Sequence, residues 1–449
     1  MVPLRTLNRR QLIKASVAGA ITLPYIVSPS VIARAGRTPP SDRITLGCIG
    51  VGNRGRSVMG GFLGQEACRV TAVCDVNAHQ LAIAKRKVNG ANRTKSCRTF
   101  KDFRELLGRD DIDTVLIAPP DHWHVMIALA AARAGKDIYL EKPIGVSMAE
   151  AWALREALRR YQSVFQFGTQ QRSDARFRLA CELVRNGRIG PLREINVWSP
   201  GSNSGGSTEL TDPPEWLDYE MWVGPAPISP HTKGRCTNRF ERGDGFKIWP
   251  FISDYCVGWI SGWGVHPLDI AVWGTGEGLS GSFEIEGAGK FPTSGVCDTA
   301  TDWELTIKYE TGVRVNFSGP SGARRWAGRY GRVSGHGTAF EGDDGWLHVN
   351  RGRLNANPAD LPKSTFAPDA PRLYKSTNHA RNFLDCVRTR KETISNIDSA
   401  LAVDTICQIS AIAVQLGRKL KWNAKLQRFE NDSTANGMLS RAMRQPWHM

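Results

Sequence analysis

A short apolar run followed directly by a glycine-rich turn most constrains what this chain can fold into. Ile44 to Ile49 has the character of a buried strand, Gly50-Val51-Gly52-Asn53-Arg54-Gly55 follows, and a helix-compatible stretch begins at Ser57. In such a GxGxxG turn the first glycine permits a tight turn, the second lets the backbone approach a pyrophosphate, and the third lets the helix pack on the strand. The segment predicts a dinucleotide-binding unit, with Gly50, Gly52, Asn53, Arg54 and Gly55 at the cofactor.

A carboxylate follows where such a unit carries its ribose-binding acid. The apolar run Val70 to Cys74 ends in Asp75, about 20 residues after Gly55. A carboxylate here accepts hydrogen bonds from the ribose hydroxyls and repels a 2′-phosphate, which favours NAD over NADP. NADP stays open as the alternative, because Arg54 could contact a phosphate.

Further strand and helix patterns extend this unit into a doubly wound sheet. Strands are predicted at 114–118 and 137–140, with a helix over 122–134 between them. Alternating strands and helices form a parallel sheet. We therefore predict an α/β fold whose N-terminal Rossmann domain covers residues 36–165.

Ligands of such sheets bind beyond the carboxyl ends of the strands. The segments at those ends supply further candidate cofactor residues: Pro119, His122, His124, Glu141 and Lys142. A lysine between a glutamate and a proline, directly after a buried strand, is an unusual place for a solvated charge and would face the nicotinamide. We interpret Lys142 as catalytic; a structural ion pair at the strand end is the alternative.

The second half of the chain has a different pattern, rich in short strands. Alternating segments at 192–198, 303–309 and 313–317 predict a largely antiparallel sheet. We assign residues 166–416 to an α+β domain, whose helical region 379–416 is expected to pack back on the first domain as helices near 382–388 and 399–416. Residues 417–449 are rich in Lys and Arg and less periodic, so we expect a C-terminal tail packed on the surface.

Residues 1–35 have the layout of a twin-arginine export signal. Arg9-Arg10 precedes a weakly hydrophobic segment that ends at the small-residue site Ala33-Arg34-Ala35. Because this route carries folded cargo, it suits a protein that is loaded with a cofactor before export. We expect a chain exported folded to the periplasm or another extracytoplasmic location; an ordinary basic N-terminus or an uncleaved anchor is the alternative.

Composition excludes several other functions. The net charge of +16 admits acidic partners, but basic and acidic residues are interleaved and no nucleic-acid-binding motif is present, so no nucleic-acid partner is expected. No uninterrupted apolar run reaches about 18 residues, so we expect no membrane span. The ten cysteines form no CxxC and no HExxH is found, so no metal site is predicted.

Tryptophan is concentrated in one part of the second half. Half of the 14 tryptophans lie between Trp198 and Trp273. Indole rings stack on the faces of pyranoses, which suits a sugar-like ligand, although large aromatic side chains more often pack in a core. We expect one or two of these rings to contact a substrate. The seven are Trp198, Trp216, Trp222, Trp249, Trp259, Trp263 and Trp273.

These motifs, in this order, resemble those of the Gfo/Idh/MocA oxidoreductases. The resemblance rests on the glycine turn, Asp75-Val76-Asn77, Pro-Asp-His-Trp-His at 120–124 and Glu141-Lys142-Pro143, and it continues through 168–172, 216–225, 264–269 and 379–383. It covers nearly all of the chain after the predicted signal. It implies a sugar or cyclitol substrate and an open second domain, whose sheet carries the substrate on one face and often an oligomer contact on the other. The chain is therefore expected to be a homo-oligomer, either a dimer or a tetramer.

The resemblance also assigns roles in the second domain. His266 matches the family's catalytic histidine, which accepts the proton of a carbinol hydroxyl while Lys142 hydrogen-bonds the same oxygen. Asp269, three residues later on the same helical face, is predicted to orient the imidazole. Gln171 and Arg172 are expected to bind the substrate together with His266.

One position departs from the family pattern. Many dehydrogenases of this family carry an aspartate four residues before the histidine, and here that residue is Gly262. The proton relay is therefore incomplete in the sequence. Either Asp254 or Asp269 could compensate, or the chemistry could differ from simple dehydrogenation.

Three hypotheses of function follow. The leading one is an NAD(P)-dependent oxidoreductase acting on a secondary hydroxyl or ketone of a sugar, cyclitol or glycoside. Its dinucleotide would be tightly bound and recycled, because no soluble NAD pool is expected outside the cell. The second is a glycosidase or lyase that oxidises the sugar transiently, eliminates the aglycone and reduces the product. The third is a non-catalytic protein that binds a dinucleotide or a glycan.

Overall fold

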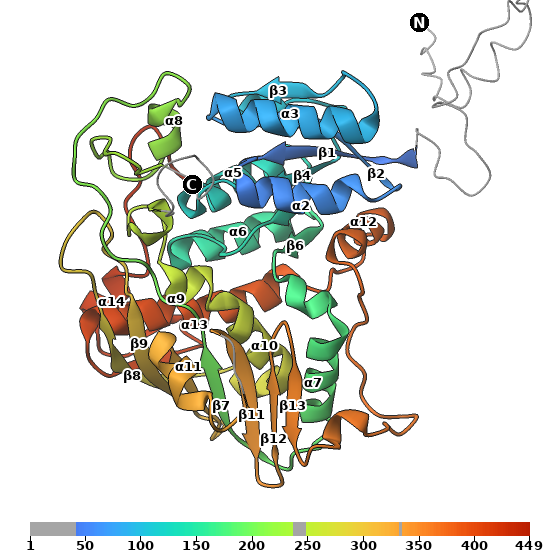
Figure 1. Ribbon diagram of the computed structural model, residues 1–449, viewed down its shortest axis with the longest axis vertical. Coiled ribbons are helices and arrows are strands. Elements are labelled where there is room, and N and C mark those ends of the chain that lie inside the picture. Colours follow the sequence, from blue (N-terminus) through green and yellow to red (C-terminus); the bar gives the residue numbers. More distant parts are fainter. Residues whose placement is uncertain (1–41, 237–247, 332–334) are drawn as a thin grey trace, which may run out of the picture. The chain divides into compact units, whose positions relative to one another are not determined.

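Six parallel strands form the first sheet of the computed structural model, in the order β3-β2-β1-β4-β5-β6 (Figure 1). This is the strand order of dinucleotide-binding folds. The central strands are almost wholly buried, as expected for a sheet covered on both faces. The strands are β1 (Ile44–Ile49), β2 (Cys68–Cys74), β3 (Arg98–Phe100), β4 (Thr114–Ile117), β5 (Asp137–Leu140) and β6 (Phe165–Phe167). The predicted doubly wound parallel sheet is confirmed.

The structure describes residues 42–236, 248–331 and 335–449. The predicted export signal, residues 1–35, lies outside the described residues. The predicted domain boundary at residue 165 falls on the first residue of β6, which still pairs with β5.

The helices of the first domain begin in two different ways. α3 (Ala78–Asn92) starts at Asn77, whose side chain accepts the amides of His79 and Gln80. α6 (Met148–Tyr161) starts with a reciprocal capping box between Ser147 and Glu150. α2 (Asn53–Leu63) instead begins after Gly52 with no side-chain cap, so its first amides are left for another acceptor.

Nine strands form the second sheet, in the order β13-β12-β11-β7-β10-β9-β8-β14-β15. All neighbouring strands are antiparallel except β7 and β10, which are parallel. The strands are β7 (Leu192–Trp198), β8 (Phe283–Lys290), β9 (Asp302–Tyr309), β10 (Arg314–Ser318), β11 (Gly337–Gly342), β12 (Trp346–Val349), β13 (Leu354–Asn357), β14 (Leu420–Asn423) and β15 (Arg428–Phe429). The predicted α+β domain with a largely antiparallel sheet is confirmed.

Helices join the two sheets. α10 (Val265–Thr275) packs on α7 (Ala175–Arg185) and on strands β7 and β11, and α13 (Ile397–Leu416) contacts both α6 and β8 (Figure 1). α12 (His379–Thr389) lies against α2. Within the described residues α13 alone is long and apolar enough to cross a membrane, and 72% of that stretch is buried inside the protein.

The end of the chain is not the surface tail expected from the sequence. β14 and β15 extend the second sheet, and Leu420, Trp422 and Phe429 are buried. The lysines that alternate with them, Lys419 and Lys421, form ion pairs on the other face, with Glu284 and Glu430. The expectation was wrong because the basic composition concealed a short amphipathic strand.

Candidate active site

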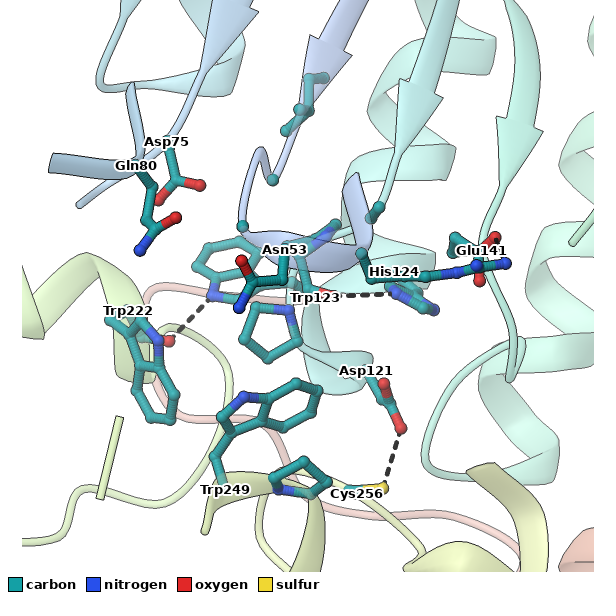
Figure 2. A pocket seen from close by; sticks show the side chains of 18 of the residues that line it. Asn53, Asp75, Gln80, Asp121, Trp123, His124, Glu141, Trp222, Trp249 and Cys256 are labelled. Atoms are coloured by element: carbon teal, nitrogen blue, oxygen red, sulfur yellow. Dashed lines mark hydrogen bonds and ion pairs between the residues drawn. The ribbon is translucent and has the colours of Figure 1, made fainter. Parts of the chain in front are cut away.

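One cavity of about 320 Å³ brings the glycine turn, Asp75, Lys142 and His266 together. Its walls come from the carboxyl ends of the parallel strands and from the second domain, including α9 (Trp259–Gly262) and the start of α10. Figure 2 shows Asn53 between two sets of polar groups, with Asp75 and Gln80 at the upper left and Asp121 and Cys256 at the bottom. The cavity therefore lies where a doubly wound sheet binds its ligands.

The glycine turn leaves room for a phosphate. Gly50 has a φ of +76°, and a Cβ there would lie 2.2 Å from the backbone nitrogen of Pro119, so a larger residue would be both strained and blocked. Gly52 lines the cavity. Gly55 lies behind it, where a Cβ would be 1.9 Å from the carbonyl oxygen of Gly50. Gly55 therefore acts as predicted on packing, by letting α2 approach the turn, rather than by facing the cavity.

Two polar side chains of the cavity, Asp75 and Asn53, are suited to bind the parts of a dinucleotide other than its phosphates. The carboxylate of Asp75 accepts the backbone amides of Val51 and Asn77, at 2.8 and 2.9 Å, which fixes it at the end of β2. Asn53 lines the cavity, and its Nδ2 is buried without a hydrogen-bond partner among the described residues. A buried donor of this kind is stabilised by a ligand acceptor. The chain thus fits a bound dinucleotide.

A charged cluster surrounds the end of β5. Arg54 Nη2 donates to Glu141 Oε1 at 2.9 Å, and Gln170 Nε2 donates to the same oxygen at 2.8 Å. Burial would raise the pKa of Glu141, but the positive charges of Arg54 and Lys142 outweigh it and lower that pKa. Glu141 is therefore ionised and anchors Arg54 beside the turn.

Lys142 is held from the other domain. Its Nζ donates to the backbone carbonyl oxygen of Gly262 at 2.7 Å, and both residues line the cavity. Because an ammonium group has three donors, this bond fixes the position of Nζ and leaves two donors for a ligand.

His266 lies in the first turn of α10, and 4% of its surface is exposed. Burial lowers its pKa well below the ordinary value, and the charges of Lys142 and Arg351 lower it further. Among the described residues its Nδ1 has no hydrogen-bond partner. The imidazole is thus neutral and able to accept a proton.

The predicted partner of His266 is elsewhere. The carboxylate of Asp269 receives two bonds from Arg172, at 2.8 and 2.6 Å, and both side chains are buried. Arg172 also donates to the carbonyl oxygen of Ile394 and lies over the ring of Trp273. Neither residue lines the cavity, so the assignments of Asp269 to catalysis and of Arg172 to substrate are corrected: they form a buried structural pair. Asp254, the other proposed substitute for an acid at position 262, does not line the cavity either.

The histidines after β4 take different positions. Pro119 and His124 line the cavity, and the ring nitrogens of His124 face the carbonyl oxygens of Pro143 and Pro119 at 2.6 and 3.1 Å. His122 points away into the protein, where its Nε2 lies 3.0 Å from the carbonyl oxygen of Trp222, and burial lowers its pKa to about 4. The prediction that His122 contacts the cofactor is therefore wrong, because its ring faces Trp222 and does not line the cavity.

The structure adds residues that the sequence did not single out. Asp121 and Cys256 line the cavity, and Cys256 Sγ donates to Asp121 Oδ2 at 2.9 Å (Figure 2). Arg351, from the loop after β12, also lines it. Its Nε lies 3.2 Å from Gln171 Oε1 when the Gln171 amide is oriented so that its nitrogen donates to the carbonyl oxygen of His266 at 3.0 Å. Cys256 and Arg351 belong to no motif, whereas Asp121 lies in the Pro-Asp-His-Trp-His run at 120–124, of which only the histidines were predicted to contact the cofactor.

The tryptophans divide between core and cavity. Trp222, Trp249, Trp259 and Trp263 line the cavity. Trp198 is fully buried against Tyr330 and His348.

Among the described residues, no group of three His, Cys, Asp or Glu side chains could hold a metal ion.

Known proteins are similar to parts of this chain in sequence and to most of it in fold. A glycosyl hydrolase family 109 protein of Shewanella sp. (strain ANA-3) is 34% identical over 163 residues, which is 33% of this chain and 36% of that protein. The chain thus spans about a third of the length of this curated relative.

Solved structures match over a greater length, at low identity. The aldose-aldose oxidoreductase of Caulobacter crescentus, complexed with glycerol, has a TM-score of 0.60 at 18% identity and covers 84% of this chain and 99% of its own. GenD2, from gentamicin A biosynthesis and in complex with NAD, has a TM-score of 0.61 at 15% identity and covers 88% and 99%. At these identities the likeness shows the fold.

Two family models match almost the whole described chain. The model of the NAD-binding Rossmann fold matches residues 44–169, and the model of the C-terminal alpha/beta domain matches residues 198–449, more than half of the chain. The first domain is therefore an NAD(P)-binding domain. The chain belongs to the Gfo/Idh/MocA family of oxidoreductases.

Proposed function

We propose that the protein transfers hydride to or from a secondary hydroxyl or ketone of a sugar, cyclitol or glycoside, using a dinucleotide that stays bound between turnovers. One observation carries this proposal: Lys142 and His266, from different domains, line the same cavity as the glycine turn and Asp75. A carbinol placed between them would have His266 as a proton acceptor and Lys142 as a hydrogen-bond donor that stabilises the developing negative charge.

The chain's own groups would act on the oxygen of that carbinol. When bound, the nicotinamide supplies the acceptor or donor of hydride at the carbon. His266, neutral because of its lowered pKa, takes the hydroxyl proton on an imidazole nitrogen. Lys142 Nζ, held by the carbonyl oxygen of Gly262, donates a hydrogen bond to the oxygen as its negative charge develops. In the reverse direction the same groups return the proton to the ketone oxygen.

The location and assembly of the protein are parts of the same proposal. The twin-arginine layout of residues 1–35 supports export in the folded state to an extracytoplasmic space. Retention of the dinucleotide follows from that location, because free cofactor exchange would be unproductive there. The family membership supports a homo-oligomer, a dimer or a tetramer.

A single-turnover experiment tests the proposed chemistry. The purified protein with its retained dinucleotide is mixed with a panel of sugars, cyclitols and glycosides, and the near-ultraviolet absorbance of reduced nicotinamide is followed. At least one compound should change the redox state in the native protein, and Lys142→Ala and His266→Ala should slow that change. If no compound alters the absorbance of a fully loaded protein, the proposal fails.

A redox glycosidase is the second candidate. The name of the Shewanella relative favours it, since that protein is described as a glycosyl hydrolase family 109 protein. In this mechanism oxidation of the sugar would make a neighbouring C–H bond acidic, and loss of that proton would expel the aglycone and leave an unsaturated ketone. Water would add to the double bond in a glycosidase, or not add in a lyase, and the bound dinucleotide would return its hydride to the ketone. Release of an aglycone without net reduction of NAD would support this candidate, and stoichiometric accumulation of reduced nicotinamide would exclude it.

A further inference from the structure

A second cavity, of about 530 Å³, adjoins the first and shares two arginines with it. Arg54 and Arg351 line both cavities. The remaining walls of the second cavity come mainly from α2, the segment 170–174 and the start of α12, and most of the side chains there are polar or small. A ligand that extends from Lys142 and His266 into the second cavity would therefore pass the guanidinium groups of Arg54 and Arg351 and enter a polar space.

The carboxylates near these two arginines already form ion pairs, but Arg351 itself pairs with none of them. Glu141 accepts from Arg54, and Asp174, which lines the second cavity, is paired with Arg176 at 2.7 Å. Arg351 has no carboxylate within 4.0 Å among the described residues. Partial desolvation lowers the pKa of Arg351 although the residue is exposed overall, the like charge of Arg54 lowers it further, and Glu141 raises it. The junction of the two cavities thus has an excess of positive charge.

Arg351 is held in place although it has no counterion. Its guanidinium lies over the ring of Trp263, 4.8 Å from the centroid, and its Nε is oriented by Gln171. Its two terminal nitrogens make no hydrogen bond to the described part of the chain, and the residue is exposed. A guanidinium fixed at Nε and open at both terminal nitrogens is arranged for two parallel bonds to an anion.

The same contacts connect Arg351 to the reacting end of the cavity. Trp263 packs edge-on against His266 with ring centroids 5.4 Å apart, and the Gln171 amide that orients Arg351 also contacts the carbonyl oxygen of His266. An anion on Arg351 and a carbinol at His266 could therefore belong to one sugar-sized molecule.

From this geometry we propose that the substrate is an acidic sugar, whose anionic substituent is bound by Arg351 at the junction of the two cavities. The substituent is a carboxylate or a sulfate ester, which present the same oxygens to a guanidinium. The inference rests on the proposed function, because it names the substrate class for that site. Arg351 is a specificity residue here and takes no part in proton or hydride transfer.

Matched pairs of ligands test the substrate class. D-glucuronate and D-galacturonate, and the 6-sulfates of glucose and galactose, are compared with the neutral parent sugars on the loaded protein. Binding is followed by tryptophan fluorescence, since Trp263 lies under Arg351, and turnover by nicotinamide absorbance. At least one acidic sugar should bind about tenfold or more tightly than its neutral parent, as expected for charge-assisted hydrogen bonds. That preference should weaken as salt is added.

Variants of Arg351 separate this effect from general electrostatics. Arg351→Gln should reduce the ratio of kcat/KM for the acidic sugar to that for the neutral sugar about tenfold or more, and Arg351→Lys should restore it only in part, because lysine lacks the planar fork. Arg325→Gln removes an arginine that pairs with Glu304 outside both cavities and should leave the ratio unchanged. Thermal unfolding confirms that each variant is folded.

The outcomes are distinguishable. Redox turnover of neutral sugars at least as efficient as that of acidic ones, or a ratio unaffected by Arg351→Gln, overturns this inference and leaves the proposed function standing. Absence of turnover with every sugar counts against the proposed function itself. In that case a preference for acidic sugars in the fluorescence titration, lost in Arg351→Gln, would still support the anion site, and no preference would overturn it.

Discussion

Lys142 Nζ lies 2.7 Å from the carbonyl oxygen of Gly262, the residue that stands where many dehydrogenases of this family carry an aspartate. The backbone oxygen of Gly262 thus positions the ammonium group of Lys142, although the sequence indicated that the proton relay is incomplete at this position. Besides Asp75 and Glu141, the carboxylate that lines the cavity is Asp121, which is bonded to Cys256 Sγ, and neither Asp254 nor Asp269 lines it.

Because the carbonyl group does not depend on a side chain, Gly262→Ala should be tolerated. A Cβ at Gly262 would meet its nearest atoms, on Trp259 and Cys256, at ordinary distances of 3.5 and 3.9 Å. The variant should be as stable as the native protein or more stable by up to about 1 kcal/mol in thermal unfolding. Gly264→Ala is the matched contrast, since its Cβ would lie 2.1 Å from the carbonyl oxygen of Ile260, and it should be clearly destabilised. Equal melting temperatures for the two variants would contradict the geometry.

Replacing Lys142 should separate chemistry from cofactor binding. Lys142→Ala removes the donor aimed at the developing alkoxide, and we expect kcat to fall about 10²-fold to 10³-fold. The content of bound dinucleotide, measured after denaturation, should stay near that of the native protein because the glycine turn and Asp75 are untouched. A fall in occupancy that accounts for the whole loss of activity would assign Lys142 to cofactor binding instead.

The pH profile should report the lowered pKa of His266. A base is lost when it is protonated, so a lower pKa in the substrate-free protein moves the acid limb of kcat/KM to lower pH. Activity should therefore persist well below the ordinary imidazole pKa of about 6.5. The measurement is kcat/KM of the loaded protein against pH, with His266→Gln as the control. An acid limb close to pH 6.5 that disappears in His266→Gln would show that the histidine is not shifted.

Asp269 should matter for stability and not for proton transfer. Asp269→Asn leaves Arg172 buried without its counterion and should lower the free energy of unfolding by about 3–5 kcal/mol. The double variant Arg172→Met with Asp269→Leu removes both charges and should lose less. Chemical denaturation of the three proteins checks this order. A stable Asp269→Asn protein with a large loss of kcat would restore the catalytic role that the sequence suggested.

Features carried by contiguous residues could be predicted from the sequence. The turn at Gly50 to Gly55 follows a buried strand, Asp75 directly follows the next one, and Lys142 follows β5, so the parallel sheet alone brings these segments to one edge. The alternation in the second half likewise revealed a mostly antiparallel sheet, because one of its faces is solvated.

Side-chain pairings between distant segments could not be predicted. Asp269 shares a helical face with His266, yet it pairs with Arg172, 97 residues away, and helix periodicity says nothing about such a partner. Arg351 lies in a loop without a motif, and its place beside Trp263 depends on the second sheet. His122 and His124 differ by two positions, but the turn of Asp121–Trp123 before α5 (His124–Arg133) sends one inward and leaves the other at the cavity.

The most direct test of this account is to identify the dinucleotide retained by the protein. The mature protein is purified from an export-competent host and denatured, and the released small molecules are identified by mass and by their near-ultraviolet absorbance. We expect stoichiometric NAD or NADH. A protein that is empty, and that also fails to bind added NAD or NADP, would contradict both the oxidoreductase and the redox-glycosidase proposals.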